Sequence, residues 1–120
     1  MSKRDVGAFG ESKAVFYLEE FGIKIVERNF FAKGGEIDII ATEGDTLLFV
    51  EVKYRSSKRF GSAIEAITPT KLKRIYLAAM QYLEKFPTEV FRFDLIAIDG
   101  EKIEWVKNIF EGYDTLIGGG

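Results

Sequence analysis

Cysteine and histidine are both absent from this chain of 120 residues. Their absence excludes disulfides, thiol nucleophiles, zinc sites built from these residues, and catalytic triads that need a histidine base. The chain also lacks a charged-then-apolar N-terminal segment and an uninterrupted run of about 18 apolar residues, so we expect neither a signal peptide nor a membrane span. A cytoplasmic protein is the default expectation, and any chemistry must use carboxylates, lysine and a hard metal ion.

The length predicts one domain, which we place at residues 1–117. The three final glycines, Gly118 to Gly120, are expected to form a flexible tail.

Apolar periodicity and turn signals predict the order helix, three strands, helix, two strands. This order indicates an α/β or α+β domain in which helices flank one mixed five-stranded sheet, and α/β is the class that we predict. The expected elements are a helix from about Asp5 to Phe21, a strand over 23–31, a hairpin of 35–40 with 47–53, a helix that begins at Thr68-Pro69, and a hairpin of 91–98 with 102–106. In the second helix, the residues expected to face the core are Leu72, Ile75, Ala79, Leu83 and Phe86.

The first hairpin carries charges inside two apolar strands. If it turns on Gly44-Asp45, opposed residues sum to 89, so Asp38 faces Glu51 and Glu36 faces Lys53. Two carboxylates opposed in a strand pair repel each other, which favours a cation site over a purely structural role. The alternative is a buried ion pair in which Lys53 neutralises Glu36 or Glu51. Oxygen ligands alone would select Mg²⁺ or Mn²⁺.

Glu11 lies within the apolar face of the first helix, beside Ala14, Val15, Tyr17, Leu18 and Phe21. It is either a third carboxylate of the site or a side chain that reaches solvent or pairs with a lysine. The same helical wheel places Phe9 and Phe16 on the polar side, as a partner contact or as ordinary surface aromatics.

The net charge is -2, but acids and bases are segregated along the chain. Five acids and no base occur from Glu36 to Glu51. The following segment contains seven bases against Glu65: Lys53, Arg55, Lys58, Arg59, Lys71, Lys73 and Arg74. The net charge argues mildly against nucleic acid as a partner, but an acidic pocket beside a basic segment can form a metal-using, phosphate-binding site. The alternative is a solvated charged loop.

Five segments together resemble the YraN-like family of bacterial proteins: Gly10-Glu11, Gly35-Glu36-Ile37-Asp38, Phe49-Val50-Glu51-Val52-Lys53, Thr68-Pro69 and Arg92-Phe93-Asp94. That family is similar in fold to the restriction-endonuclease-like superfamily, the PD-(D/E)xK nucleases, and in particular to archaeal Holliday-junction resolvases. The resemblance implies that Asp38 and Glu51 bind metal, that Lys53 is the catalytic lysine, and that Glu11 is the helix carboxylate. Ile37 stands where the superfamily motif has proline, and the resemblance assigns no role to Glu36, Arg92 or Asp94.

These observations lead us to expect an Mg²⁺- or Mn²⁺-dependent endonuclease that acts on structured or branched DNA, with a homodimer as one expected form. One alternative is a nucleic-acid-binding module that does not cleave. Another is an assembly protein that uses Phe9 and Phe16 as its contact.

Overall fold

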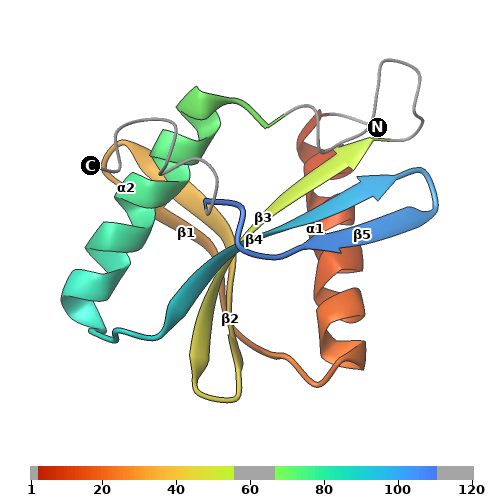
Figure 1. The fold of residues 1–120 in the computed structure, drawn as a ribbon. Coiled ribbons are helices and arrows are strands. Elements are labelled where there is room, and N and C mark those ends of the chain that lie inside the picture. Colours follow the sequence, from red (N-terminus) through yellow and green to blue (C-terminus); the bar gives the residue numbers. More distant parts are fainter. Residues whose placement is uncertain (1–2, 56–66, 111–120) are drawn as a thin grey trace.

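The computed structural model describes residues 3–55 and 67–110, and its elements follow the expected order αβββαββ (Figure 1). Lys58, Arg59 and the glycine tail at 118–120 lie outside the described residues. The elements are α1 (Lys3–Glu20), β1 (Lys24–Ala32), β2 (Gly35–Glu43), β3 (Thr46–Arg55), α2 (Pro69–Lys85), β4 (Phe91–Asp99) and β5 (Lys102–Val106). Neither of these two helices is long and apolar enough to cross a membrane.

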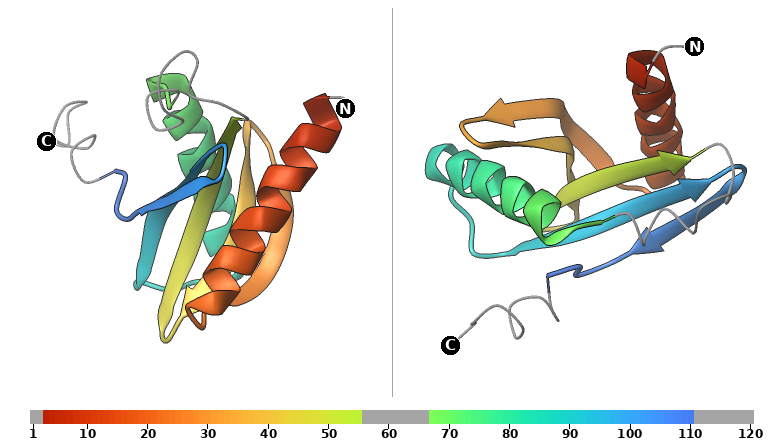
Figure 2. Two further views of the ribbon diagram at one scale, coloured as in Figure 1. Left: turned by 90° about the vertical axis from the view of Figure 1, so that its right-hand side faces the viewer. Right: turned by 90° about the horizontal axis from the view of Figure 1, so that it is seen from above.

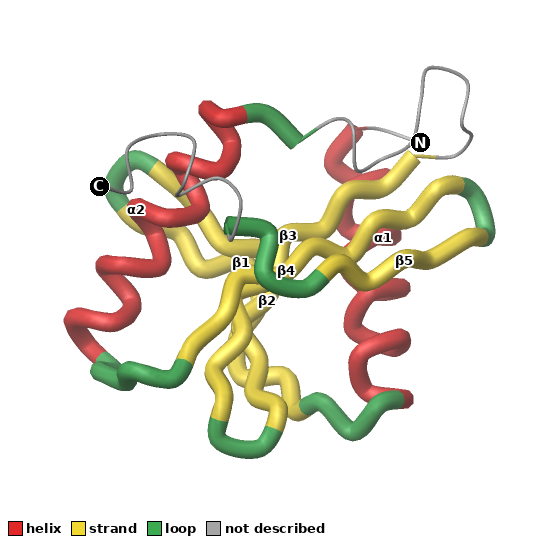
Figure 3. Tube along the Cα trace, in the orientation of Figure 1, coloured by secondary structure: helices red, strands yellow, loops and turns green. Residues whose placement is uncertain are grey.

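The five strands form one mixed sheet in the order β1-β2-β3-β4-β5. Only β3 and β4 run parallel, and the other three neighbouring pairs are antiparallel. The parallel pair requires a crossover connection, which contains α2. Short turns join the antiparallel strands (Figure 3).

The β2–β3 hairpin has the predicted register from Glu43↔Thr46 to Ile39↔Val50. Its two-residue turn contains Gly44, whose φ of 59° lies in the left-handed region that glycine adopts without steric cost. The pairing ends at Ile39↔Val50, so neither predicted pair, Asp38 with Glu51 or Glu36 with Lys53, belongs to the ladder, and the prediction that Glu36 and Lys53 face each other across it is wrong.

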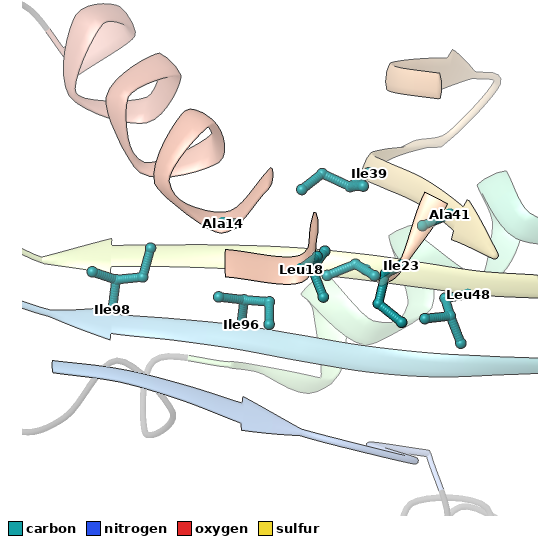
Figure 4. Packing of buried hydrophobic residues seen from close by; sticks show 9 residues of the cluster. Ala14, Leu18, Ile23, Ile39, Ala41, Leu48, Ile96 and Ile98 are labelled. Atoms are coloured by element: carbon teal, nitrogen blue, oxygen red, sulfur yellow. The ribbon is translucent and has the colours of Figure 1, made fainter. Parts of the chain in front are cut away.

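Helix α1 covers one face of the sheet through two fully buried residues, Ala14 and Leu18. They pack against apolar side chains of β2, β3 and β4, including Ile39, Leu48 and Ile96 (Figure 4). Phe21 was predicted to share this face but is exposed. It lies beyond the last residue of α1, where the helical spacing no longer applies.

Helix α2 covers the opposite face, and the two views of Figure 2 show the helices on either side of the sheet. Leu72, Ile75 and Ala79 are buried as predicted, and Leu83 is partly buried against the same cluster. The prediction for Phe86 is wrong, because this residue is exposed. It follows the end of α2 as the C-cap with non-helical dihedral angles, and Tyr82, one turn earlier, packs against Phe30 and Phe49 instead. Ala78 is also buried there.

Candidate active site

The candidate site lies where β2 and β3 stop pairing. Beyond Ile39↔Val50, the backbone N–H of Val52 donates to Oδ2 of Asp38 at 2.8 Å. A side-chain oxygen therefore takes the place of a ladder carbonyl, and this bond holds the Asp38 carboxylate beside Glu51. The two acids therefore interact just beyond the end of the ladder, without being paired within it.

Among the acids of the described residues, Glu51 has the largest shift in pKa. Its side chain is only 2% exposed, and Oε1 lies 3.1 Å from Nζ of Lys71. As an ionised carboxylate it has no hydrogen-bond donor at Oε2. Burial, reinforced by the charge of Asp38 and opposed by Lys71, raises the pKa of Glu51 from 4.5 to about 8. Glu51 is therefore mostly protonated near neutral pH, and its proton can be donated to Asp38.

Glu11 reaches the same region from α1 because Gly10 allows the helix to approach β3 closely. A Cβ at Gly10 would lie 2.6 Å from Cβ of Tyr54, so a larger residue would push α1 away from the strand. Oε1 of Glu11 is buried and has no hydrogen-bond partner. Burial and then the nearby charge of Asp38 raise the pKa of Glu11. Asp38 therefore interacts with two other predicted site residues, Glu11 on one side and Glu51 on the other.

Asn29 is a member of this cluster that the sequence analysis missed. It lies in β1 opposite Asp38, between the pairs Arg28↔Ile39 and Phe30↔Ile37, with a φ of 54°. A left-handed residue inside a strand costs about 1 to 3 kcal/mol, and such strain clusters at functional sites. The side chain of Asn29 hydrogen-bonds to Glu11 and opposes the rise in the pKa of that acid. The available signal was an asparagine, which tolerates this conformation, in an otherwise strand-like segment.

The lysine in contact with the acids is Lys71 on α2, not Lys53. Burial lowers the pKa of Lys71, but Glu51, Asp38 and Glu36 outweigh that effect, so the net shift is upward. Lys53 is half-buried on β3, and no carboxylate of the described residues lies within 4.0 Å of its ammonium group.

Two local features bring Lys71 to the site. Thr68 caps α2 by accepting a hydrogen bond from the backbone N–H of Lys71 at 3.1 Å, which fixes the first turn. Gly35 begins β2 directly beneath the helix, and an added Cβ there would overlap the backbone carbonyl oxygen of Arg74. The glycine therefore permits the close packing of β2 against α2 that places Lys71 beside Glu51.

The remaining bases predicted to bind nucleic acid are only partly described. Lys73 and Arg74 are exposed on α2, next to Lys71. Arg55 ends β3, where its carbonyl accepts a hydrogen bond from the backbone N–H of Gly100 at 2.7 Å. In the described part of the basic segment, two exposed cationic side chains, Lys73 and Arg74, therefore lie on the same helix as Lys71.

A cavity of about 550 Å³ opens beside Glu11, between α1 and the β1–β2 hairpin. It is lined by Gly7, Ala8, Glu11, Arg28, Asn29, Phe31 and Glu36. Because Glu11 belongs to both the cavity and the carboxylate cluster, a molecule bound in the cavity would lie next to the acids.

Arg92 and Asp94, which the resemblance left without a role, form a separate structural cluster. The fully buried Asp94 accepts hydrogen bonds from the Arg92 guanidinium, from Nε1 of Trp105 at 2.9 Å and from the backbone N–H of Asn108 at 3.2 Å. Arg92 also contacts Glu43 at 3.2 Å. Every charge here has a partner, so this cluster joins β4, β5 and the chain after β5 rather than offering a cation site.

The acids around Glu51 differ, because they suit a divalent cation. Among the described residues, no group of three or more acidic, histidine or cysteine side chains is arranged as a complete metal-binding set. Mg²⁺, however, is usually held by one or two carboxylates together with water and substrate phosphate. Asp38 and Glu51 supply two such carboxylates, and the unpartnered Oε2 of Glu51 fits this requirement.

The αβββαββ core and its motifs define a class of protein with a PD-(D/E)xK nuclease-like arrangement, as the sequence predicted. Residues 10–98 match the family model described as "Uncharacterised protein family UPF0102", and the chain belongs to this family. A UPF0102 protein of Dechloromonas aromatica is 47% identical over 90% of this chain and 90% of its own length. Similar proteins occur in Herminiimonas arsenicoxydans, at 44% identity over 92% of this chain and 90% of the relative, and in Shewanella loihica, at 45% over 87% and 92%.

Proposed function

We propose that this protein is an Mg²⁺- or Mn²⁺-dependent endonuclease that hydrolyses phosphodiester bonds in nucleic acid. The observation that carries the proposal is that Asp38 lies near both Glu51 and Glu11, and that these acids have fewer hydrogen-bond donors than their oxygens need. A structural ion pair would match each charge with a partner, as the Asp94 cluster does. Here two buried carboxylate oxygens remain without a donor.

Asp38 and Glu51 are the proposed metal ligands, and Glu11 completes or orients the site. A divalent cation bound there would acidify water and stabilise the charge that develops on the phosphate. Glu51 must lose its proton to act as a ligand, and a cation bound to its carboxylate would compete with Lys71 for that negative charge. The ammonium group of Lys71 is then available to the phosphate backbone beside Lys73 and Arg74. Lys53 retains its predicted role of positioning the attacking water.

The proposed substrate is DNA with a structured or branched form, in line with the resemblance to Holliday-junction resolvases. A homodimer would suit a branched substrate, because two sites could act on two strands. The bases that we propose to contact the phosphates are Lys53, Arg55, Lys58, Arg59, Lys71, Lys73 and Arg74.

The decisive experiment is a cleavage assay with purified protein, Mg²⁺ or Mn²⁺, and duplex, single-stranded, flap and four-way DNA. Glu51→Gln and Lys53→Gln should each abolish cleavage, and the losses should not add because the residues act as a unit. Glu104→Gln, which changes an exposed acid on β5, is the matched control and should cleave normally. Full cleavage by Glu51→Gln would refute the site assignment. Binding of DNA without cleavage under every condition would replace the nuclease by a binding module.

A further inference from the structure

The cavity beside Glu11 has features that the proposed phosphodiesterase chemistry does not use. Its volume of about 550 Å³ lies within the range of about 300 to 1,000 Å³ typical of small-ligand sites. One wall is α1 near Glu11, and the other is formed by residues of β1 and β2.

Phe31 forms an exposed aromatic surface on this wall. Its side chain is 71% exposed, and no aromatic ring of the described residues stacks on it. The preceding residue, Phe30, instead packs edge-on against Tyr82, with ring centroids 5.3 Å apart, so β1 is anchored to the core beside Phe31. A ring on an anchored strand loses little conformational freedom when a flat ligand stacks on it.

Polar groups of both kinds surround this ring. Phe31 pairs with Glu36 across the β1–β2 ladder, which places a carboxylate beside the ring. Oε1 of Glu11 is a buried acceptor without a donor. Arg28 supplies the cation, and its guanidinium lies 3.4 Å from Oγ of Ser12 on α1.

This combination selects a particular kind of ligand. Two carboxylates against one guanidinium disfavour a free anion, and the polar rim disfavours a purely apolar molecule. A neutral, planar group with N–H donors and an attached phosphate satisfies every feature. It stacks on Phe31, donates its exocyclic amino hydrogens to Glu36 or Glu11, and leaves its phosphate to Arg28.

We therefore propose that the cavity is a subsite for one unpaired nucleobase, next to the phosphodiester bond presented to Asp38 and Glu51. This inference rests on the proposed action on nucleic acid. A base within a duplex has both faces stacked and its pairing edge occupied, so the subsite requires a single-stranded segment or a nucleotide turned out of the helix. The site thereby favours substrates with unpaired nucleotides over perfect duplex.

The test uses a short single-stranded DNA that carries one 2-aminopurine, whose fluorescence is quenched by stacking, with Ca²⁺ in place of Mg²⁺. Phe31→Ala should weaken binding by about 5-fold to 150-fold, the equivalent of ~1 to 3 kcal/mol per stacked base, and should remove the quenching. Phe31→Tyr should restore both. Phe16→Ala is the matched control, because Phe16 is 72% exposed but lies outside the cavity. Binding to fully paired duplex should change much less in Phe31→Ala.

The outcomes separate this inference from the nuclease proposal. If wild type cleaves DNA but Phe31→Ala binds and quenches like wild type, the subsite is wrong and the nuclease stands. If wild type never cleaves but shows quenching that depends on Phe31, the nucleobase subsite is supported and the nuclease proposal is wrong. Equal weakening by Phe31→Ala and Phe16→Ala, or no binding of nucleic acid by wild type, would overturn the subsite.

Discussion

Replacement of Glu51 by glutamine should change how stability depends on pH in the metal-free protein. The pKa of Glu51 is raised from 4.5 to about 8 in the folded state, first by burial and then by the charge of Asp38. A carboxyl group with a raised folded-state pKa stabilises the fold fully below its unfolded pKa, near 4.5. That contribution disappears as the pH rises through about 8. Glutamine resembles the protonated acid but cannot ionise, so Glu51→Gln should lack this loss.

The size of the effect follows from the difference between the two pKa values. Each factor of ten in proton affinity corresponds to about 1.4 kcal/mol, which gives an upper limit of about 5 kcal/mol for Glu51. Lys71 and relaxation of the site reduce that limit. We expect wild type to lose about 2 to 4 kcal/mol relative to Glu51→Gln between about pH 5 and pH 8. This loss is a large part of the ~5 to 15 kcal/mol stability of a typical domain.

Urea unfolding in EDTA, followed by the fluorescence of Trp105, measures this difference. Trp105 is the only tryptophan in the chain and lies on β5, which β4 separates from the strand of the substituted residue. The comparison cancels the other groups that titrate in both proteins, including Glu11. Glu104→Gln should follow the wild-type pH profile. Parallel profiles for wild type and Glu51→Gln would refute the reasoning that Glu51 is buried as an acid with a raised pKa.

Three further predictions concern the metal site and its surroundings. In EDTA, Asp38→Asn should leave the free energy of unfolding unchanged or raise it. Wild type should gain about 1.4 kcal/mol of stability in thermal melts at a free Mn²⁺ concentration ten times its dissociation constant. A destabilised Asp38→Asn, together with a wild type whose stability does not respond to metal, would contradict the metal site. Lys71→Gln should bind Mn²⁺ about 10-fold more tightly in calorimetry, because it removes a positive charge that competes with the metal at Glu51. The control Lys73→Gln should have the metal affinity of wild type. Equal affinities of the two variants would show that Lys71 is not part of the site. Asp94→Asn should lower the free energy of unfolding by about 3 to 5 kcal/mol, because it removes a fully buried carboxylate that pairs with Arg92 and accepts a hydrogen bond from Trp105. A loss below about 1 kcal/mol in urea titrations would contradict the structural role.

Local patterns in the sequence were enough to predict the elements and the first pair of acids. Helical spacing, the Thr68-Pro69 start of α2 and the turn at Gly44 are signals contained within a few residues, and the structure confirms the order of elements. The two-residue turn also determined the register that places Asp38 beside Glu51, because one turn type permits one alignment of its strands. Burial of Ala14 and Leu18 followed from spacing alone.

Predictions from residue spacing were wrong where an element ends or where elements distant in the chain meet. Phe86 continued the apolar periodicity of α2, but it follows the last helical residue, and Tyr82 takes the buried position. Lys53 was expected to lie beside the acids of the site, because it is two residues from Glu51 on the same strand. The structure instead places Lys71 there, because α2 packs against Gly35 closely enough for its first turn to reach β3.

The end of the β2–β3 ladder before Asp38 and the left-handed Asn29 opposite Asp38 also arise from tertiary structure. The sequence by itself therefore determined which residues form helices and strands and which two carboxylates meet across the hairpin. Only the packing of α1 and α2 onto the two faces of the sheet decided the rest, bringing Glu11 and Lys71 to those carboxylates. Close approaches at Gly10 and Gly35 depend on contacts between elements far apart in the chain, and no local pattern specifies them.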